Sequence, residues 1–232
     1  MNTFTNAIGF FFDHLSLFLS KTIEHLELSL AAVLVSIVIA IPPGVWLGHL
    51  HRGSFLAINI SNVGRAVPSL AIIAVGIALL GLGFFPTMVA LVLLAAPIML
   101  TNAYVAVDGV DRDAVDAARG MGMTSAEVLR RVEVPLALPL TFAGIRTATV
   151  YVIATATLAA VTGGGGLGEI IVNQASYGAE GVVAGAMAVA ILALGAELIL
   201  AAVQRALTPK GLRGHSGKQP AAGPPRTAVT NV

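Results

Sequence analysis

Residues 108–139 read DGVDRDAVDAARGMGMTSAEVLRRVEVPLALP, and they are the one long polar stretch in an otherwise apolar chain. The stretch carries ten of the 25 charged side chains, 13 basic and 12 acidic, in the 232-residue sequence. The whole chain is 56% hydrophobic and 11% charged, whereas soluble domains contain about 25% charged residues. We therefore expect an integral membrane protein whose polar stretch faces water or a partner.

Local signals within the polar stretch predict two short helices. Asp111 is a suitable N-cap for the first helix, and Gly120 and Gly122 provide its stop. Thr124 and Glu127 have the Thr-x-x-Glu spacing of a capping box, which predicts the start of the second helix. We expect the second helix to end at Pro135, because proline lacks a backbone donor.

An apolar line with spacings of three and four residues runs through both predicted helices. One face is therefore expected to pack while the charged face points outward. The line comprises Val115, Ala118, Met121, Ser125, Val128 and Val132.

A longer motif with fixed spacing overlaps these helices. It consists of Asp116-Ala117-Ala118, Gly122 and Val132-Glu133-Val134-Pro135. The motif resembles the Glu-Ala-Ala…Gly…Ile-x-Leu-Pro signature of the permease subunits of binding-protein-dependent ABC importers. Three positions depart conservatively from that signature, with Asp for Glu, Val for Ile and Val for Leu. The Asp shortens the reach of the carboxylate but keeps its charge.

In that family the motif lies in the coupling-helix region, which docks in a groove of a cytoplasmic ATPase subunit. The resemblance therefore assigns residues 108–135, hereafter the coupling loop, to contact with an ATPase. The implied ATPase-coupling residues are Asp116, Ala117, Ala118, Gly122 and Pro135. Gly122 is expected to permit a close approach or a bend, and the two alanines are expected to keep the docking face small.

Five further segments resemble the glycine betaine/carnitine/choline branch of these permeases. They are RAVPSLA (65–71), AARGMGMT (117–124), PLALP (135–139), GIRTATV (144–150) and GGGGLG (163–168). The resemblance covers roughly residues 25–207. It implies an all-α, polytopic membrane protein with the type I ABC importer (MetI-like) permease fold and about five core transmembrane helices.

The resemblance also implies function and partners. The chain is expected to be the permease subunit of an ATP-driven importer in a bacterial inner or plasma membrane, moving a small quaternary-amine compatible solute. The implied partners are ATPase subunits, an extracytoplasmic substrate-binding protein, a second permease subunit (a second copy or a paralogue) and membrane lipid. No cofactor is expected in this chain, since ATP and Mg²⁺ are bound by the ATPase. The chain itself is not expected to be an enzyme.

Two alternative functions are open at this point. One is import of another small solute, such as an amino acid-like betaine. The other is ATP-independent secondary transport, although such carriers usually place ionisable groups along their spans, and these are scarce here.

Composition excludes several other classes. With no cysteine, the chain has no disulfide framework, thiol catalysis or Cys-based metal site. A net charge of +1 argues against a nucleic-acid partner. Gly163–Gly166 lacks the Lys-Ser/Thr that grips a nucleotide in a phosphate loop. The first thirty residues lack the pattern of a removable signal peptide.

Apolar segments outside the coupling loop divide the chain. The predicted spans are 26–50, 68–80, 88–107, 136–161 and 182–207, within a permease domain at 26–207. Residues 1–25 are expected to form an amphipathic interfacial segment, with a short extra span as the alternative. Residues 208–232 are expected to be a disordered cytoplasmic tail. Pro42-Pro43-Gly44 is expected to break the regularity of the first span.

The distribution of charge predicts the orientation. His49, His51 and Arg52 mark an aqueous end after the first span, and the coupling loop and the tail are also rich in basic residues. The opposite loops contain Glu169 and Glu180 but no Lys or Arg. The positive-inside rule therefore places the coupling loop and the C-terminus in the cytoplasm.

Two charged residues fall within or near predicted spans, Arg146 in the fourth and Glu197 in the fifth. Intramembrane charges are candidates for functional residues, and both lie toward the cytoplasmic half, so they are expected to pair or to lie on the pathway. The alternative is that Arg146 extends to the interface while Glu197 faces a wet cavity.

Overall fold

The computed structural model describes residues 2–51, 59 and 67–208 of the chain, and every regular element in these ranges is helical. The α-helices are α1 (Asn2–Asp13), α2 (Leu15–His49), α4 (Ser69–Leu80), α5 (Phe84–Asp108), α6 (Arg112–Gly120), α7 (Ser125–Val128), α8 (Val134–Thr155), α9 (Gly168–Val172) and α10 (Gln174–Leu207). A π-helical turn (Leu129–Glu133) joins α7 to α8, and a 3₁₀-helix (Ala156–Thr162) follows α8.

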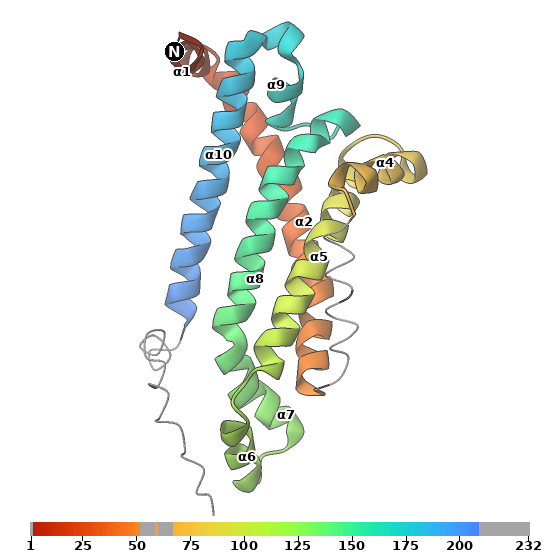
Figure 1. The fold of residues 1–232 in the computed structure, drawn as a ribbon, viewed down its shortest axis with the longest axis vertical. Helices are drawn as coiled ribbons and strands as arrows, with labels where there is room; N and C mark the ends of the chain where they lie inside the picture. The colour runs from red at the N-terminus through yellow and green to blue at the C-terminus, as the bar shows by residue number, and fades with distance from the viewer. Residues whose placement is uncertain (1, 52–58, 60–66, 209–232) are drawn as a thin grey trace, which may run out of the picture.

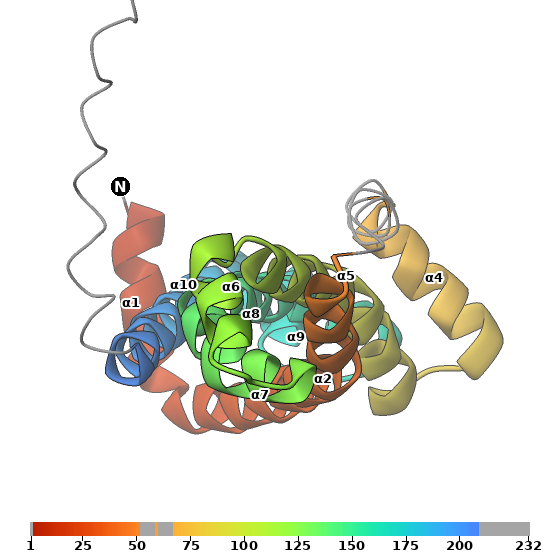
Figure 2. The ribbon, with the colours of Figure 1, turned by 90° about the horizontal axis from the view of Figure 1, so that it is seen from below.

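Helices α2, α5, α8 and α10 run along the long axis of the molecule (Figure 1). α6 and α7 lie at one end of this bundle, and α9 lies at the other (Figure 1). Seen from below, α6 and α7 cover the end of the bundle (Figure 2). The coupling loop and the C-terminal end of α10 therefore share one end of the molecule.

The centre of the bundle is an apolar core contributed by α2, α5 and α8. Its fully buried members include Leu28, Leu91, Met99 and Val152. Small residues bring α2 and α5 together, because a Cβ added at Gly44 would lie 2.6 Å from the Leu100 carbonyl oxygen. Such close backbone packing is the usual basis of helix association in a membrane.

Four helical stretches in the described part of the chain are long and apolar enough to cross a membrane: Leu15–His49, Phe84–Asp108, Ser125–Thr162 and Gln174–Leu207. The first of these begins before the predicted 26–50, since α2 already starts at Leu15. The predicted break at Pro42-Pro43-Gly44 is wrong, because α2 remains helical through both prolines. Packing against neighbouring helices makes such prolines tolerable.

The predicted second span, 68–80, is the 12-residue helix α4. At 1.5 Å per residue it is about 18 Å long, shorter than a hydrocarbon core of about 30 Å. α4 projects to one side of the bundle (Figures 1 and 2). Alone, α4 is too short to span the membrane. Residues 52–58 and 60–66, which precede α4, lie outside the described ranges. The predicted tail also lies outside them from residue 209 onward.

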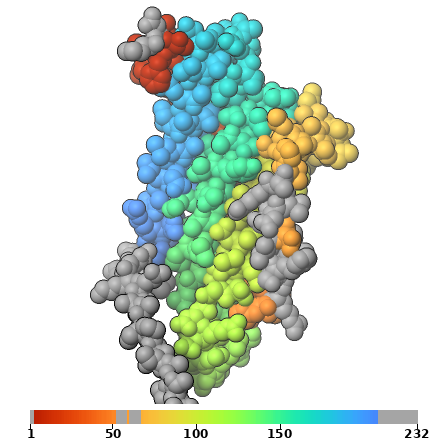
Figure 3. All heavy atoms as spheres, in the orientation of Figure 1, coloured from red at the N-terminus to blue at the C-terminus, as the bar shows by residue number. Residues whose placement is uncertain are grey.

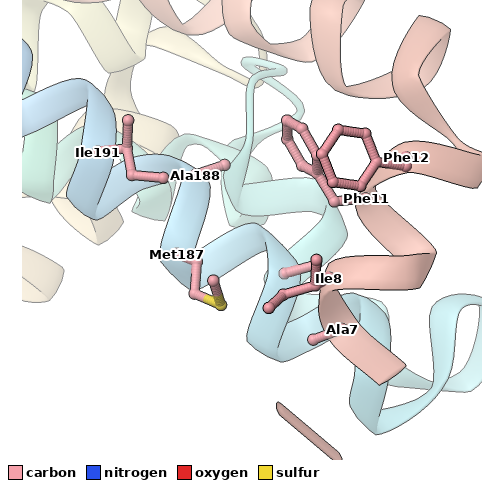
Figure 4. Close-up of a pocket in the computed structure, with 8 residues that line it drawn as sticks. Ala7, Ile8, Phe11, Phe12, Met187, Ala188 and Ile191 are labelled. Carbon is pink, nitrogen blue, oxygen red and sulfur yellow. The ribbon is translucent and has the colours of Figure 1, made fainter. Parts of the chain in front are cut away.

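Helix α1 is separate from α2 and packs on α10. An apolar groove of about 200 Å³ lies between the two helices, where Phe11 and Ile8 of α1 face Met187 and Ile191 of α10 (Figure 4). The break between α1 and α2 falls at His14, so only this first helix matches the separate N-terminal segment expected over 1–25. Its interfacial position stays a prediction.

The Gly-rich segment lies at the end of the bundle opposite the coupling loop (Figure 1). Gly163, Gly165 and Gly166 have positive φ angles of 70°, 79° and 90°, a region that favours glycine. The Gly166 N–H donates to Oε2 of Glu24 at 2.9 Å. The segment is therefore tied to α2.

Lys21, a basic residue of α2, lies at this same end of the bundle. Lys21 Nζ is 2.9 Å from a Glu24 carboxylate oxygen and 2.6 Å from a Glu169 carboxylate oxygen. Lys21 lies outside the loops whose charges predicted the orientation. In the structure, Glu24 and Glu169 pair with it and neutralise its charge.

Candidate functional site

The candidate site is the coupling loop, which forms the lower tip of the molecule in the space-filling view (Figure 3). Its first helix, α6, begins as predicted: the Asp111 side chain accepts a hydrogen bond of 3.0 Å from the Asp113 N–H. Asp113 in the first turn and Arg119 in the last turn complement the helix dipole. The cap therefore sets the direction in which α6 leaves the bundle.

Gly122 ends α6 in a Schellman motif. The N–H of Met123 donates to the Ala118 carbonyl at 3.2 Å, and the N–H of Gly122 donates to the Arg119 carbonyl at 2.9 Å. Gly122 has a φ of +85°, and nothing lies within 4 Å of an added Cβ. Within this chain, Gly122 therefore provides the bend between the helices. A close approach of a partner at Gly122 stays a prediction.

Helix α7 begins with the predicted capping box. Oε2 of Glu127 accepts from the N–H and from the hydroxyl of Thr124, both at 2.9 Å, and the Glu127 N–H points back at Thr124 Oγ1. Hydrogen bonding from the Thr124 N–H, and then from its hydroxyl, lowers the pKa of this loop carboxyl. The turn before α7 is thus closed by side chains of the loop itself.

A small core holds α6 and α7 together. Val115, Ala118 and Val128 are buried, and Met123 and Val132 pack against them. The predicted apolar line is wrong at two positions. Met121 is 73% exposed, and Ser125 is also exposed. The left-handed turn at Gly122 changes the helical phase, so that Met123 faces the core in place of Met121.

The outward face of α6 presents Asp116, Ala117 and Arg119, all exposed. Asp116 and Arg119 lie one turn apart, with 3.8 Å between a carboxylate oxygen and a guanidinium nitrogen. A groove of about 250 Å³ beside this face is lined in part by His51 and Arg112. Ala118 is only 2% exposed and packs in the small core beneath this face. Its part in ATPase coupling stays a prediction.

Pro135 does not end the second helix. The chain passes from α7 through the π-helical turn into α8, and Pro135 is the second residue of α8. The N–H of Val134 donates to the Leu129 carbonyl, five residues back, which widens the helix before the proline. The change in hydrogen bonding thus falls just before the proline, and the helical path continues from Ser125 to Thr162.

Three contacts that sequence analysis missed join the end of α2 and the residues just after it to the coupling loop. His49 Nδ1 lies 2.5 Å from Oε2 of Glu133, and its Nε2 lies 2.7 Å from the Ser125 hydroxyl. His51 Nδ1 lies 2.8 Å from Oδ1 of Asp108. The available signal was two histidines at the end of a span and acidic residues at both ends of a polar loop.

The structure brings Arg146 and Glu197 together. The guanidinium Nε lies 3.0 Å from Oε1 of Glu197, and NH1 donates to Gln204 at 2.9 Å. Gln204 in turn donates to the Pro139 carbonyl at 2.8 Å. These contacts connect α8 to α10, and a part in the pathway stays a prediction.

Known proteins similar to this chain include transport permeases. The family described as "Binding-protein-dependent transport system inner membrane component" matches residues 32–210. The chain is 44% identical over 197 residues to the glycine betaine/carnitine/choline transport system permease protein OpuCB of Bacillus subtilis (strain 168), covering 84% of this chain and 91% of that protein. It is 43% identical over 196 residues to the choline transport system permease protein OpuBB of the same organism, covering 84% and 90%.

A solved structure shares the fold. A chain from the inward-facing MetNI methionine ABC transporter superposes with a TM-score of 0.73 at 22% identity, covering 84% of this chain and 98% of that chain. At this identity the likeness concerns the fold alone.

Proposed function

This chain belongs to the family of binding-protein-dependent transport system inner membrane components, and from that premise we propose that it is the permease subunit of an ATP-driven importer of small quaternary amines. Glycine betaine, choline and carnitine are the proposed substrates. The observation that carries the proposal is the 44% identity, over 84% of the chain, to a permease named for these three solutes. The protein is a multi-pass component of a bacterial membrane and a transport subunit.

The proposed partners follow from the family. An extracytoplasmic binding protein delivers the solute, a second permease subunit completes the pathway, and ATPase subunits bind ATP and Mg²⁺. The exposed face of α6 around Asp116 and Ala117 is the proposed ATPase contact. It suits docking because the face is polar, carries only short side chains at Asp116 and Ala117, and rests on the buried core of the coupling loop.

The continuous helical path gives the coupling loop a direct mechanical link to the membrane. In the proposed cycle, closure of the ATPase pair displaces α6 and α7. α8 moves with them, because α7 continues through the π-helical turn into α8 without a hinge loop. Rigid elements of this kind carry coupling between distant sites. ATP hydrolysis thereby changes the access of a pathway between the two permease subunits.

The proposed orientation places the coupling loop and the C-terminus in the cytoplasm. It is supported by four arginines in the coupling loop, Arg112, Arg119, Arg130 and Arg131. At the other end, Lys21 is paired with Glu24 and Glu169. This pairing leaves Lys21 little net positive charge to oppose the positive-inside rule.

Reconstituted transport tests the proposal. The chain is co-expressed with its ATPase, binding-protein and permease partners, and uptake of labelled glycine betaine, choline and carnitine into proteoliposomes is measured. We expect uptake that requires ATP and the binding protein and that other trimethylammonium compounds inhibit. Dimethylglycine, which lacks the quaternary nitrogen, is the matched control and should compete weakly. Uptake without ATP would contradict the importer, and equal competition by dimethylglycine would contradict the substrate class.

A further inference from the structure

The last residue of α2, His49, is held between two parts of the coupling loop. Its Nδ1 faces Glu133, the last residue of the π-helical turn, and its Nε2 faces Ser125, the first residue of α7. His49 is 8% exposed and Glu133 is fully buried. The imidazole therefore bridges both ends of the short helical segment 125–133.

Glu133 is a buried acid whose carboxylate contacts His49. Oε2 of Glu133 is bonded to the imidazole, whereas Oε1 has no hydrogen-bond partner within the described part of the chain. A buried carboxyl group is unfavourable unless it is paired, and an apolar residue of similar size would pack there at less cost. Packing alone therefore does not explain why position 133 holds an acidic residue.

A second histidine repeats the arrangement at the start of the coupling loop. His51 contacts Asp108, the last residue of α5, at 2.8 Å. The φ of His51 is +49°, an uncommon region for a residue other than glycine. The chain thus adopts a strained turn just after α2 at the point where His51 reaches α5.

We propose that these two histidine–carboxylate contacts form a latch that makes the end of α2 move with the coupling loop during the transport cycle. The latch consists of His49, His51, Asp108, Ser125 and Glu133. These are positioning residues: none is proposed to contact substrate or nucleotide. The inference rests on the proposed function, since it concerns how ATPase motion spreads through the permease.

The latch adds α2 to the moving body. α8 is already continuous with α7, whereas the covalent connection of α2 to the loop runs through residues 50–68 and then through α4 and α5. Leu28 and Ala40 of α2 pack in the same buried cluster as Val152 of α8. A displacement of the loop that reaches α2 and α8 together therefore acts on both sides of the central core.

Spin labels test the latch directly, and the absence of native cysteine in this chain makes site-specific labelling simple. One label replaces Val38 on α2, which is 70% exposed, and the other replaces the exposed Ala126 on α7. Val38 lies eleven residues before His49, or about 17 Å along the helix, which suits pulsed electron paramagnetic resonance. The distance is measured in the full complex with and without ATP.

The comparison is made in the otherwise native chain, in Glu133→Gln and in Asp113→Asn. Asp113 is the matched control, since it is an exposed acid of the same loop that lies outside the latch. We expect a narrow, ATP-independent distance in the native chain and in Asp113→Asn, and a broader distribution in Glu133→Gln. A distance that shifts with ATP in the native chain would overturn the latch, as would an equally narrow distribution in Glu133→Gln.

Transport stoichiometry supplies the functional readout. Coupling free energies typically correspond to about 5- to 150-fold effects, so we expect solute moved per ATP hydrolysed to fall roughly 5- to 10-fold in Glu133→Gln and in His49→Gln. The exchange His49→Glu with Glu133→His should restore part of the loss. An unchanged ratio in an assembled Glu133→Gln complex would contradict the proposal.

Two provisions keep the test decisive. If Glu133→Gln fails to assemble, Ser125→Ala carries the same comparison, because it removes one hydrogen bond from an exposed side chain. If the parent complex hydrolyses ATP without moving any quaternary amine, the proposed function is contradicted. The width of the label distance without ATP still decides the latch in that case, because this measurement requires no transport.

Discussion

Arg146 Nε lies 3.0 Å from Glu197 Oε1, joining α8 to α10 through an ion pair between two membrane-spanning stretches. The guanidinium also donates to the side-chain oxygen of Gln204. The side-chain nitrogen of Gln204 donates in turn to the Pro139 carbonyl. The pair therefore belongs to a chain of polar contacts that follows the side of α8 toward the coupling loop.

Charge exchange at this pair should distinguish pairing from independent exposure of the two groups. Arg146→Glu and Glu197→Arg each leave two like charges facing one another, and an unpaired charge in a membrane span costs roughly 2.5–3.5 kcal/mol. We expect each single variant to lower thermal stability in detergent and ATP-driven uptake, and the double exchange to recover both. Arg205→Glu, an exposed position on α10, is the control. Failure of the exchange to recover either quantity would mean that the contact has no energetic weight.

Gly122 and Gly120 provide a matched pair for the turn in the coupling loop. A left-handed conformation costs a residue with a Cβ roughly 1–2 kcal/mol, and Gly122 has a φ of +85°. Gly122→Ala should therefore reduce the stability of the coupling loop and the amount of ATPase that co-purifies. Gly120→Ala should do neither, since Gly120 is helical and nothing lies within 4 Å of its added Cβ. Gly122→Asn should be milder than Gly122→Ala because asparagine tolerates this region. Equal effects of both alanine variants would refute the conformational explanation.

The adjacent alanines of the motif should respond in opposite ways to enlargement. Ala117→Leu adds bulk to the exposed face, so we expect a folded permease that captures less ATPase. Ala118→Leu overpacks the small core with Val115 and Val128, a change that typically costs roughly 1–3 kcal/mol. We therefore expect the midpoint of thermal unfolding of Ala118→Leu to fall. The two readouts are unfolding in detergent and co-purification of the ATPase; a stable Ala118→Leu variant would contradict the burial argument.

Gly44 should tolerate no side chain, because α5 occupies the space. An added Cβ would lie 2.6 Å from the Leu100 carbonyl oxygen and 2.9 Å from the Ala103 Cβ. Gly44→Ala should force α2 away from α5 and destabilise the bundle by roughly 1–3 kcal/mol, measured by thermal unfolding. Gly195→Ala on α10 meets nothing within 4 Å and should be neutral or slightly stabilising, since alanine favours helix. A neutral Gly44→Ala would show that the two helices separate easily.

Local features of the coupling loop were predictable because their partners are a few residues apart. The Asp111 cap and the Thr124–Glu127 capping box are confirmed, and both connect positions within three residues. Pro135 shows the limit of the same local reasoning. A π-helical turn before it widens the helix and carries the chain into α8, and a single-residue breaker rule does not include that option.

Burial within the coupling loop was less predictable, because helical periodicity assumes an uninterrupted helix. The turn at Gly122 resets the phase, and the core therefore takes Met123 instead of Met121. The exposure of α6 residues also depends on which side of α6 receives α7. That choice separated Ala117 on the surface from Ala118 in the core.

The sequence by itself determined the membrane class, the position of the polar loop, its helix caps and the family resemblance, because hydropathy, capping and motif spacing are read along the chain. Only the tertiary structure decided the contacts of His49 with Glu133, 84 residues apart, and of Arg146 with Glu197, 51 residues apart. Such partners are selected by which helices become neighbours and by the rotation of each helix about its axis. Both depend on the packing of small residues such as Gly44 against another backbone, which a one-dimensional pattern does not specify.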